Sequence, residues 1–319
     1  MSERARVVVL RELLPAGREQ LERRFEVESL GLGATRDQML AAAAGADALV
    51  TDLTFAVDGE LLDAAGPRLK VVANFGVGYD NIDLDECAAR DVTVTNTPDA
   101  LTNATAELAL ALAMSAARDL PGAERDLRAG RWQGWDPRRW RGFELTGATI
   151  GVVGAGRIGG RFMELVSGFG GHRLYTSRRR KFHLEEKLGA RHVELDELLQ
   201  RSDLVSLHLP GGPDTEGLIG ERELELMKPT AVLVNTGRGT LVDSAALARA
   251  LEEGSIGAAG LDVFEGEPAV PPELLAAPRV SLAPHIGSAT YRSRDDMARM
   301  VAENVTAVLE GRDPPNPVT

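Results

Sequence analysis

Short apolar segments alternate with helical patterns along the whole chain. The apolar segments include RVVVL, ADALVT, LKVVANFGV, VTVTN, TIGVVG, HRLYTS, LVSLHLP, AVLVNTG, GAAGLDV and RVSLAPH. Segments that are apolar on both faces and separated by helices are typical of parallel sheets covered on two sides. We therefore predict an α/β fold built from doubly wound parallel sheets.

A change of pattern near the middle of the chain indicates two domains. An Ala/Leu-rich helix is expected from about Thr102 to Leu120, and an irregular segment that holds all three tryptophans follows it. The last predicted helix, from about Ala289 to Leu309, has an apolar face that needs a partner, for which the first domain is the natural choice. We predict a discontinuous first domain, residues 1–99 and 287–319, that encloses a second domain, residues 100–286.

A glycine motif opens the regular part of the second domain. The sequence VVGAGRIGG places Gly154, Gly156 and Gly159 directly after a predicted strand and at the start of a predicted helix. Gly154 permits a tight turn, Gly156 lets the backbone approach a pyrophosphate, and Gly159 lets helix and strand pack closely. The helix N-terminus adds N–H groups that attract an anion. In this strand–turn–helix context we interpret the motif as a dinucleotide-binding loop rather than a turn alone.

A basic segment stands where an NAD-binding protein usually has an acidic residue. The strand HRLYTS ends at Ser177, eighteen residues after Gly159, and the run Arg178 to Lys181 follows it. An acidic residue there would bind the ribose 2′-hydroxyl, whereas a hydroxyl and guanidinium groups would bind a 2′-phosphate. A charge run alone is also typical of a solvated loop. Because the acid is missing, we predict that NADP(H) is preferred, with NAD(H) as the alternative.

Charge and composition narrow the class of protein. The net charge of −12 disfavours binding to nucleic acid or to an anionic membrane. The single cysteine, Cys87, cannot form an internal disulfide and is typical of a reducing compartment. The N-terminus has no signal-peptide pattern, and the most apolar helical stretch, ATAELALALAMSAA, is shorter than the ~20 residues needed to span a bilayer. We expect a soluble, cytoplasmic protein.

Three polar residues follow successive predicted strands in the second domain. Arg238 follows AVLVN, Glu267 follows GAAGLDV, and His285 follows RVSLA. Such strand ends share the ligand-binding edge of an open parallel sheet. A histidine can donate a proton near neutral pH, a carboxylate beside it would orient the imidazole, and an arginine would hold a substrate carboxylate. The set predicts hydride transfer between a nicotinamide cofactor and a 2-oxo acid, whereas we interpret His208 as a structural histidine near the cofactor cleft.

Six longer stretches carry a more specific pattern, namely NFGVGYDNID, NTPDALTNATAELAL, VGAGRIG, VNTGRGTLVD, GLDVFEGEP and PHIGSAT. In this order they resemble the D-2-hydroxyacid dehydrogenase family over nearly the whole chain. The resemblance implies a Rossmann dinucleotide-binding domain inserted into a flavodoxin-like substrate-binding domain. It also implies that Arg238 binds the substrate, that Glu267 is the partner of the histidine, and that His285 is the acid/base catalyst.

The resemblance extends to the residues around these three. The backbone N–H groups of Val77 and Gly78 would bind the substrate carboxylate, Leu53 would line the pocket, and Asp262 would hold the nicotinamide amide. No metal ligand is expected. The full set of expected substrate-binding residues is Leu53, Val77, Gly78, Arg238 and Ser288, and that of cofactor-binding residues is Thr105, Gly154, Gly156, Arg157, Ile158, Gly159, Ser177, Arg178, Arg179, Pro210, Thr215, Thr236, Asp262 and Gly287.

Within the family, LYTSRRRK and WDPRRW look most like the branch of glyoxylate/hydroxypyruvate reductases, which often prefer NADPH. Family members are usually homodimers joined through their cofactor domains, in the region of the tryptophan-containing arm. Trp135 is then either a residue that enters the partner subunit's active site or a packing residue of the dimer interface. We predict an NADPH-preferring reductase that converts glyoxylate to glycolate and hydroxypyruvate to D-glycerate.

Other functions stay open at this point. A 3-phosphoglycerate dehydrogenase would usually favour NAD and often carries a C-terminal regulatory domain, for which we expect no room after PPNPVT. Reductases of sugar-derived 2-keto acids remain an alternative, whereas the Arg/Glu/His set disfavours a formate dehydrogenase. A dinucleotide-sensing regulatory binding protein would keep the same fold, but the sequence has no long polar tail or peptide-docking pattern.

Overall fold

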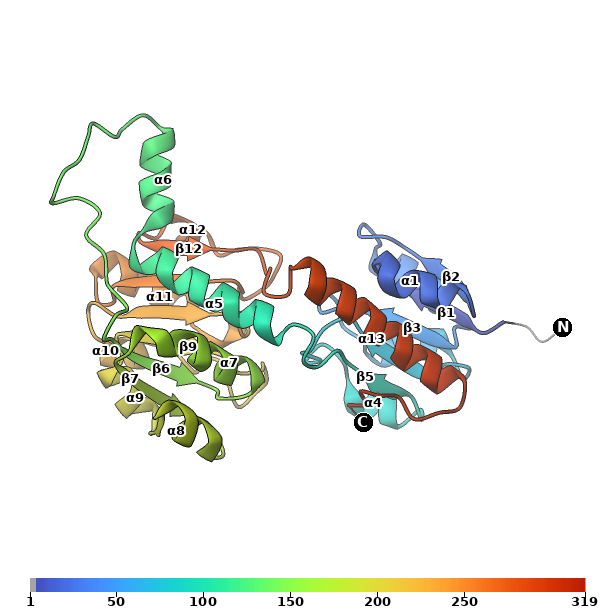
Figure 1. Cartoon of the computed structure of the whole chain (residues 1–319). Helices are drawn as coiled ribbons and strands as arrows, with labels where there is room; N and C mark the ends of the chain where they lie inside the picture. Colours follow the sequence, from blue (N-terminus) through green and yellow to red (C-terminus); the bar gives the residue numbers. More distant parts are fainter. Residues whose placement is uncertain (1–3, 319) are drawn as a thin grey trace. The chain divides into compact units, whose positions relative to one another are not determined.

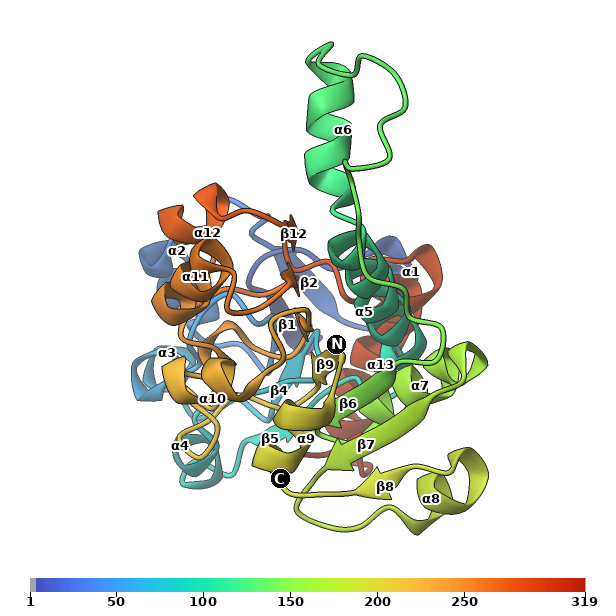
Figure 2. The same cartoon turned by 90° about the vertical axis from the view of Figure 1, so that its left-hand side faces the viewer.

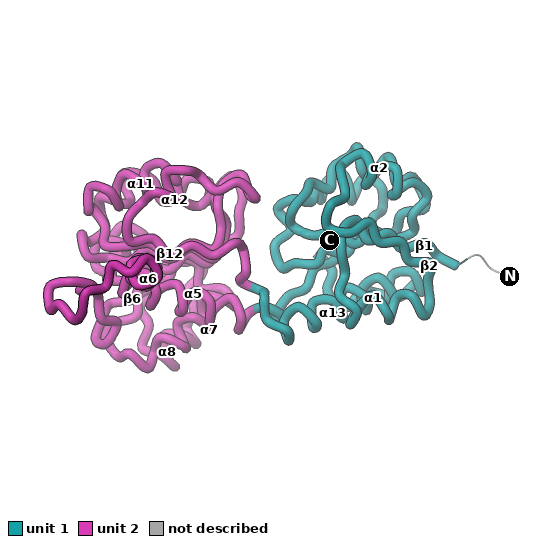
Figure 3. Tube along the Cα trace, turned by 90° about the horizontal axis from the view of Figure 1, so that it is seen from above, with its two compact units in different colours: residues 1–101, 288–319 teal, residues 102–287 magenta. Residues whose placement is uncertain are grey.

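The computed structural model describes residues 4–318 and divides into two compact units (Figure 3). Unit 1 contains residues 1–101 and 288–319, and unit 2 contains residues 102–287. The boundaries between the units lie two residues and one residue from those expected from the sequence. The predicted fold class is confirmed, because each unit contains a parallel sheet with helices on both faces.

Unit 1 is built on a five-stranded parallel sheet with the order β2-β1-β3-β4-β5. Its strands are β1 (Arg6–Val9), β2 (Glu26–Ser29), β3 (Ala48–Thr51), β4 (Val71–Asn74) and β5 (Thr93–Thr95). Its helices are α1 (Pro15–Glu22), α2 (Arg36–Ala43), α3 (Gly59–Ala65), α4 (Leu84–Ala88) and α13 (Tyr291–Leu309).

The two faces of this sheet bury alternate residues of each strand. Val7 and Val9 pack against α1 and α13, whereas Val8 packs against α2 and α3 on the opposite face. Helix α1 lies so close to α13 that a Cβ atom at Gly17 would overlap the carbonyl oxygen of Ala298. The C-terminal helix therefore belongs to the core of unit 1, although it is far from the other helices of the unit in sequence.

Unit 2 is built on a seven-stranded parallel sheet with the order β12-β11-β10-β9-β6-β7-β8. Its strands are β6 (Thr149–Val153), β7 (His172–Thr176), β8 (Arg191–His192), β9 (Leu204–Leu207), β10 (Val232–Asn235), β11 (Ala258–Leu261) and β12 (Val280–Leu282). Its helices are α5 (Thr102–Ala117), α6 (Leu120–Arg128), α7 (Arg157–Val166), α8 (Phe182–Leu188), α9 (Leu195–Arg201), α10 (Glu221–Leu226), α11 (Ser244–Glu253) and α12 (Pro272–Ala276), with short 3₁₀ helices at Ser167–Phe169 and Gly239–Leu241.

The helix expected from about Thr102 to Leu120 is interrupted, because α5 ends at Ala117 and α6 begins at Leu120. Asp119 between them adopts a left-handed backbone conformation with φ of 44°, and its side chain accepts a hydrogen bond from the N–H of Gly122. Asp119 therefore ends one helix and caps the next. Helix α5 crosses the sheet closely, since a Cβ atom at Gly260 would lie 2.9 Å from the Cβ of Leu112.

Helix α6 and the irregular segment after it form an arm that projects from the rest of unit 2 (Figures 1 and 2). We call residues 120–144 the arm. Asp126 holds it together, because its carboxylate accepts hydrogen bonds from Arg131 at 2.6 Å and from Arg139 at 2.5 Å. These hydrogen bonds, with that of Arg131 the strongest, lower the pKa of Asp126. Three tryptophans are exposed on the arm (Trp132, Trp135 and Trp140).

Among residues 4–318, no helix is both long enough and apolar enough to cross a membrane. Within the same residues, no three His, Cys, Asp or Glu side chains come together in a group that could hold a metal ion.

Candidate active site

The glycine motif forms a tight loop between β6 and α7, in keeping with its predicted strand–turn–helix context. Gly154 has φ of 93°, and a Cβ atom there would lie 2.8 Å from the carbonyl oxygen of His208. A Cβ atom at Gly159 would overlap the carbonyl oxygen of Gly154. Among residues 4–318, nothing lies within 4 Å of the corresponding position at Gly156, and no side chain caps the N-terminus of α7. Open space in front of uncapped N–H groups suits a pyrophosphate, and Arg157 and Ile158 form the first turn of that helix.

His285 and Glu267 form a direct pair in unit 2. The Nδ1 atom of His285 lies 2.6 Å from Oε2 of Glu267, and about a quarter of each side chain is exposed. The other carboxylate oxygen, Oε1, accepts a hydrogen bond of 2.8 Å from the backbone N–H of Phe264. Glu267 is thereby fixed on one side by the backbone and holds the imidazole on the other. The Nε2 atom of His285 is left as the ring nitrogen that can meet a substrate.

The charge of Glu267 is stabilised within the site. Burial of the side chain raises its pKa, but the hydrogen bonds from His285 and Phe264 and the charges of His285 and Arg238 outweigh burial. The net effect lowers the pKa of Glu267 below its ordinary value. Glu267 is therefore a carboxylate at neutral pH, and Arg238 acts on it electrostatically.

Asn235 shapes the loop that carries Arg238 at the end of β10. Its side-chain amide donates a 2.8 Å hydrogen bond to the carbonyl of Arg238, and its side-chain oxygen accepts one of 3.0 Å from the N–H of Gly237. Asn235 is almost fully buried, so that the turn rests on the core of the sheet. Thr236 in the same turn has a buried hydroxyl without a hydrogen-bond partner among the described residues, which is a group that a bound cofactor could satisfy.

Asp262 holds the loop that carries His285. Its two carboxylate oxygens accept backbone N–H hydrogen bonds from Ile286 at 2.7 Å and from Gly287 at 2.8 Å. Its backbone carbonyl accepts the N–H of His285, which has a left-handed conformation with φ of 51°. Burial raises the pKa of Asp262, although these backbone hydrogen bonds oppose it. Asp262, which is predicted to bind the nicotinamide, therefore also orients the loop of His285, a role that the sequence analysis did not include.

The basic segment after β7 is divided by its hydrogen bonds. Arg180 donates to both carboxylate oxygens of Glu185, at 3.1 and 2.6 Å, and Glu185 also accepts a bond of 2.7 Å from the hydroxyl of Tyr175. The hydroxyl of Ser177 donates to the carbonyl of Arg179 at 2.7 Å, which closes a tight turn. The side chains of Arg178 and Arg179 are exposed and form no hydrogen bond or ion pair within residues 4–318. Two of the arginines are therefore available to a ligand.

The remaining expected residues divide between the two units. Thr105 donates a hydrogen bond of 3.1 Å from its hydroxyl to the carbonyl of Gly287, and Thr215 donates one of 2.9 Å to the carbonyl of Pro210. These four belong to unit 2, as do the glycine motif and the Arg238, Glu267 and His285 set. Leu53, Val77, Gly78 and Ser288 belong to unit 1.

His208 is part of the support beneath the glycine loop. Its Nε2 atom lies 2.8 Å from the hydroxyl of Ser206, and its ring packs against Phe162 of α7 at a centroid distance of 5.2 Å. Desolvation by burial lowers the pKa of His208 from about 6.5 to about 3. The imidazole is therefore neutral, which agrees with its interpretation as a structural histidine.

The comparisons with known proteins identify the class of this fold and site. Residues 110–287 match the family described as "D-isomer specific 2-hydroxyacid dehydrogenase, NAD binding domain". The chain is 46% identical to a glyoxylate reductase of Thermococcus litoralis over 317 residues, 98% of this chain and 96% of that protein. It is 48% identical to a glyoxylate reductase of Aeropyrum pernix over 322 residues, with the same shares of the two chains.

Solved structures of other proteins are also similar to this chain. An NADPH-dependent glyoxylate/hydroxypyruvate reductase of Sinorhizobium meliloti, in complex with NADP and malonate, is similar with a TM-score of 0.87 at 36% identity, covering 99% of this chain and 97% of the other. A structure from Thermus thermophilus has a TM-score of 0.92 at 41% identity, covering 98% and 100%. The fold and site thus define an oxidoreductase that binds a nicotinamide dinucleotide. The chain belongs to the D-isomer specific 2-hydroxyacid dehydrogenase family. The family predicted from the sequence motifs is therefore confirmed.

Neutral His208 predicts a specific pH dependence of stability. Between about pH 6.5 and about 3 the unfolded chain binds a proton at this histidine that the folded chain does not. The contribution of neutral His208 to the free energy of unfolding is therefore complete above about pH 6.5 and is lost as the pH falls below it. Between about pH 7 and about pH 5, the free energy of unfolding of the wild type should fall by about 2 kcal/mol more than that of His208→Gln, measured by urea unfolding. His183→Gln, which removes an exposed histidine, should keep the wild-type difference, and an equal pH dependence in His208→Gln would contradict the prediction.

Proposed function

We propose that the protein is an NADPH-preferring reductase of small 2-oxo acids, which reduces glyoxylate to glycolate and hydroxypyruvate to D-glycerate. The observation that carries the proposal is the 2.6 Å pair of His285 and Glu267, with the charge of Arg238 acting on the same carboxylate. The names of the relatives support the substrate class, because two are glyoxylate reductases and one solved structure is a glyoxylate/hydroxypyruvate reductase.

Each of the three side chains has a separate role in this proposal. His285 donates a proton from Nε2 to the substrate oxygen, while Glu267 holds Nδ1 and stabilises the positive charge of the imidazolium before the transfer. Arg238 holds the substrate carboxylate and stabilises the negative charge that develops on the carbonyl oxygen. The bound reduced nicotinamide supplies the hydride. The backbone N–H groups of Val77 and Gly78 are proposed to bind the substrate carboxylate.

The cofactor preference is proposed from the end of β7. Ser177 occupies the strand-end region where an acidic residue would favour NAD, and the exposed Arg178 and Arg179 side chains are available to pair with a 2′-phosphate. Arg180 is held by Glu185, so that it acts as a brace for the loop rather than as a ligand. The residues proposed to hold the rest of the cofactor are the glycine loop, Arg157, Ile158, Thr105, Pro210, Thr215, Thr236, Asp262 and Gly287.

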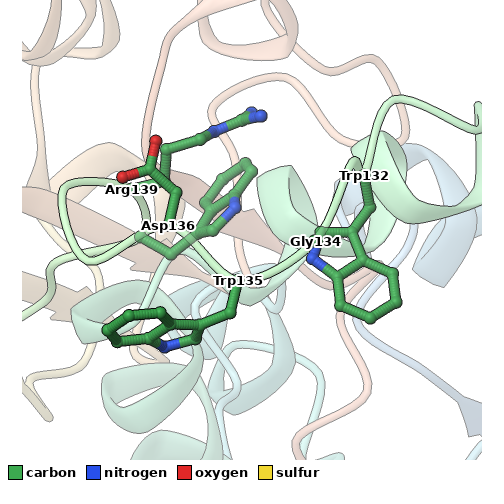
Figure 4. Close-up of a pocket in the computed structure, with 6 residues that line it drawn as sticks. Trp132, Gly134, Trp135, Asp136 and Arg139 are labelled. Carbon is green, nitrogen blue, oxygen red and sulfur yellow. The ribbon is translucent and has the colours of Figure 1, made fainter.

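A homodimer joined through the arm is proposed from its exposed aromatic surface. Trp132 is 61% exposed and Trp135 is 85% exposed, and both lie on one loop of the arm (Figure 4). The guanidinium of Arg139 lies over the ring of Trp140 at 5.0 Å. Exposed tryptophans are among the residues that dominate protein interfaces. A second copy of the chain is the proposed partner that covers them.

The catalytic proposal predicts unequal effects of two substitutions. His285→Ala should lower kcat for glyoxylate by about 10²–10⁴-fold, because the proton donor is lost. Glu267→Gln should cause a smaller loss, because the imidazole remains while its charged partner is gone. Steady-state kinetics with NADPH, together with fluorescence titration of NADPH binding, would measure both. Cofactor binding should be unchanged in both variants. Wild-type turnover in His285→Ala would assign the proton to another group, and a wild type that reduces no 2-oxo acid would favour the regulatory alternative.

The cofactor proposal predicts a difference between neighbouring arginines. Arg178→Ala and Arg179→Ala should each lower kcat/KM for NADPH by roughly ten- to a hundredfold, because a charge-assisted hydrogen bond to the 2′-phosphate is lost. The values for NADH should stay near those of the wild type. Arg180→Ala is the matched control, since the Arg180 side chain is bound to Glu185. It should change kcat/KM for NADPH and kcat/KM for NADH by similar, small factors. Equal losses with NADPH and NADH in the first two variants would count against a role in reading the phosphate.

The dimer proposal is tested by placing charge on the arm. The double variant Trp132→Asp, Trp135→Asp should sediment as a monomer at concentrations where the wild type is a dimer, because a buried carboxylate without a partner opposes association. Leu32→Asp is the control, since Leu32 is a comparably exposed apolar residue in unit 1, at 68%. It should leave the sedimentation coefficient of the dimer unchanged. A monomeric wild type, or a double variant that remains dimeric, would exclude the arm as the interface.

A further inference from the structure

The loop after β4 in unit 1 has three successive carbonyl groups that are held by hydrogen bonds. The carbonyl of Gly76 accepts the backbone N–H of Thr97 at 3.0 Å. The carbonyl of Val77 accepts the side-chain amide of Asn96 at 2.8 Å, and the carbonyl of Gly78 accepts that of Asn74 at 2.6 Å. Two asparagine side chains and one backbone group from the ends of β4 and β5 therefore fix the orientation of three consecutive peptide groups.

Fixing a carbonyl also fixes the N–H group of the same peptide. In a trans peptide the C=O and the following N–H point in opposite directions, and the peptide bonds of this loop are not cis. The N–H groups of Val77, Gly78 and Tyr79 consequently point away from the three groups that hold the carbonyls. None of the three N–H groups donates a hydrogen bond within residues 4–318. Successive N–H groups that face the same region form a concave binding site for an anion.

The two asparagines are themselves held in place. Asn74 is fully buried and Asn96 is nearly so. The carbonyl of Asn96 accepts a hydrogen bond of 3.2 Å from the side chain of Asn304 in α13, and its N–H donates one of 3.3 Å to the carbonyl of Asn316. The side-chain oxygen of Asn304 accepts the N–H of Asn316 at 3.1 Å. Helix α13 and the residues after it thus support the loop through a connected network of hydrogen bonds to Asn96.

The close approach of the loop to Asn74 limits the residue type at the first position. A Cβ atom at Gly76 would lie 3.3 Å from Nδ2 of Asn74, which is tighter than ordinary contact. Gly76 is buried, whereas Val77 and Gly78 are half-buried and Tyr79 is exposed. The loop is therefore packed at Gly76 and becomes more exposed toward Tyr79.

We propose that Asn74 and Asn96 are positioning residues for the substrate, which aim the N–H groups of Val77, Gly78 and also Tyr79 at a carboxylate group. The inference rests on the proposed function for the identity of the substrate, a small 2-oxo acid. The asparagines touch no substrate atom. They act through the three peptide groups, and Tyr79 contributes its backbone N–H rather than its side chain.

The proposal predicts a separation of KM from kcat. Asn96→Ala and Asn74→Ala should each raise KM for glyoxylate by about tenfold or more, because a charged ligand loses aligned donors. The kcat should stay within about threefold, since a carboxylate grip acts on the ground state and the transition state alike. The inhibition constant of malonate should rise by a factor similar to that of KM, and KM for NADPH should not change.

A destabilised but otherwise normal unit 1 provides the matched control. Val8→Ala removes buried volume from β1 without contacting the loop, so it should lower the melting temperature and leave both KM and malonate inhibition at wild-type values. If the asparagine variants lower the melting temperature like Val8→Ala and bind glyoxylate and malonate like the wild type, Asn74 and Asn96 are structural only and the proposal is overturned.

An NMR measurement on the wild type tests the same inference without any variant. Addition of malonate to the ¹⁵N-labelled protein with NADP⁺ should shift the amide resonances of Val77, Gly78 and Tyr79 together. Unchanged resonances at these three positions, with shifts elsewhere, would overturn the proposal even if both asparagine variants fail to fold. A wild type that reduces no 2-oxo acid would count against the proposed function, whereas the malonate shifts would still show whether the three N–H groups bind a carboxylate.

Discussion

The structure depends on one constraint of parallel sheets, which is that every strand must leave the sheet through a loop whose backbone polar groups still need partners. In this protein short polar side chains at strand ends supply those partners. Asn74 and Asn96 hold carbonyl groups of the loop after β4, Asn235 holds both ends of the turn after β10, and Asp262 holds two N–H groups of the loop after β12. Because these side chains are buried, they fix the loops to the core.

Loops fixed in this way can carry strained or charged residues. His285 has a positive φ, which is uncommon for a side chain of its size. Hydrogen bonds to Asp262 from the N–H groups of His285, Ile286 and Gly287 maintain that conformation. In this conformation the Nδ1 atom of His285 lies 2.6 Å from Oε2 of Glu267. Rigid support of this kind holds an imidazole in one orientation, which the proposed proton transfer requires.

The sequence predicted the elements well where a single physical cause decides them. Apolar strands, the glycine turn at Gly154 and the order of Arg238, Glu267 and His285 along the chain follow from periodicity and strand-end position. The helix expected from about Thr102 to Leu120 was wrong at its C-terminal end, because α5 ends at Ala117 and Ala/Leu composition does not reveal the left-handed conformation of Asp119. A basic run also does not show that Arg180 is paired whereas Arg178 is exposed and available, because the pairing of Arg180 depends on Glu185, which Tyr175 holds. The strand-end asparagines could have been found from ANFGVG and TNT, where an amide precedes or follows a strand end.

Two partly buried groups of unit 2 differ in charge state, since His208 is neutral and Glu267 is ionised. Their hydrogen-bond partners and neighbouring charges account for the difference. The ring of His208 lies beside a neutral serine, so that its desolvation is not compensated and the imidazole stays neutral. Glu267 is also partly buried, but His285, Phe264 and Arg238 together overcome desolvation and keep it ionised. The net charge of −12 does not determine either result, because surface charges beyond about 8 Å are largely screened at physiological ionic strength. The local partners of a side chain, rather than the acidity of the whole chain, therefore determine whether that side chain is charged.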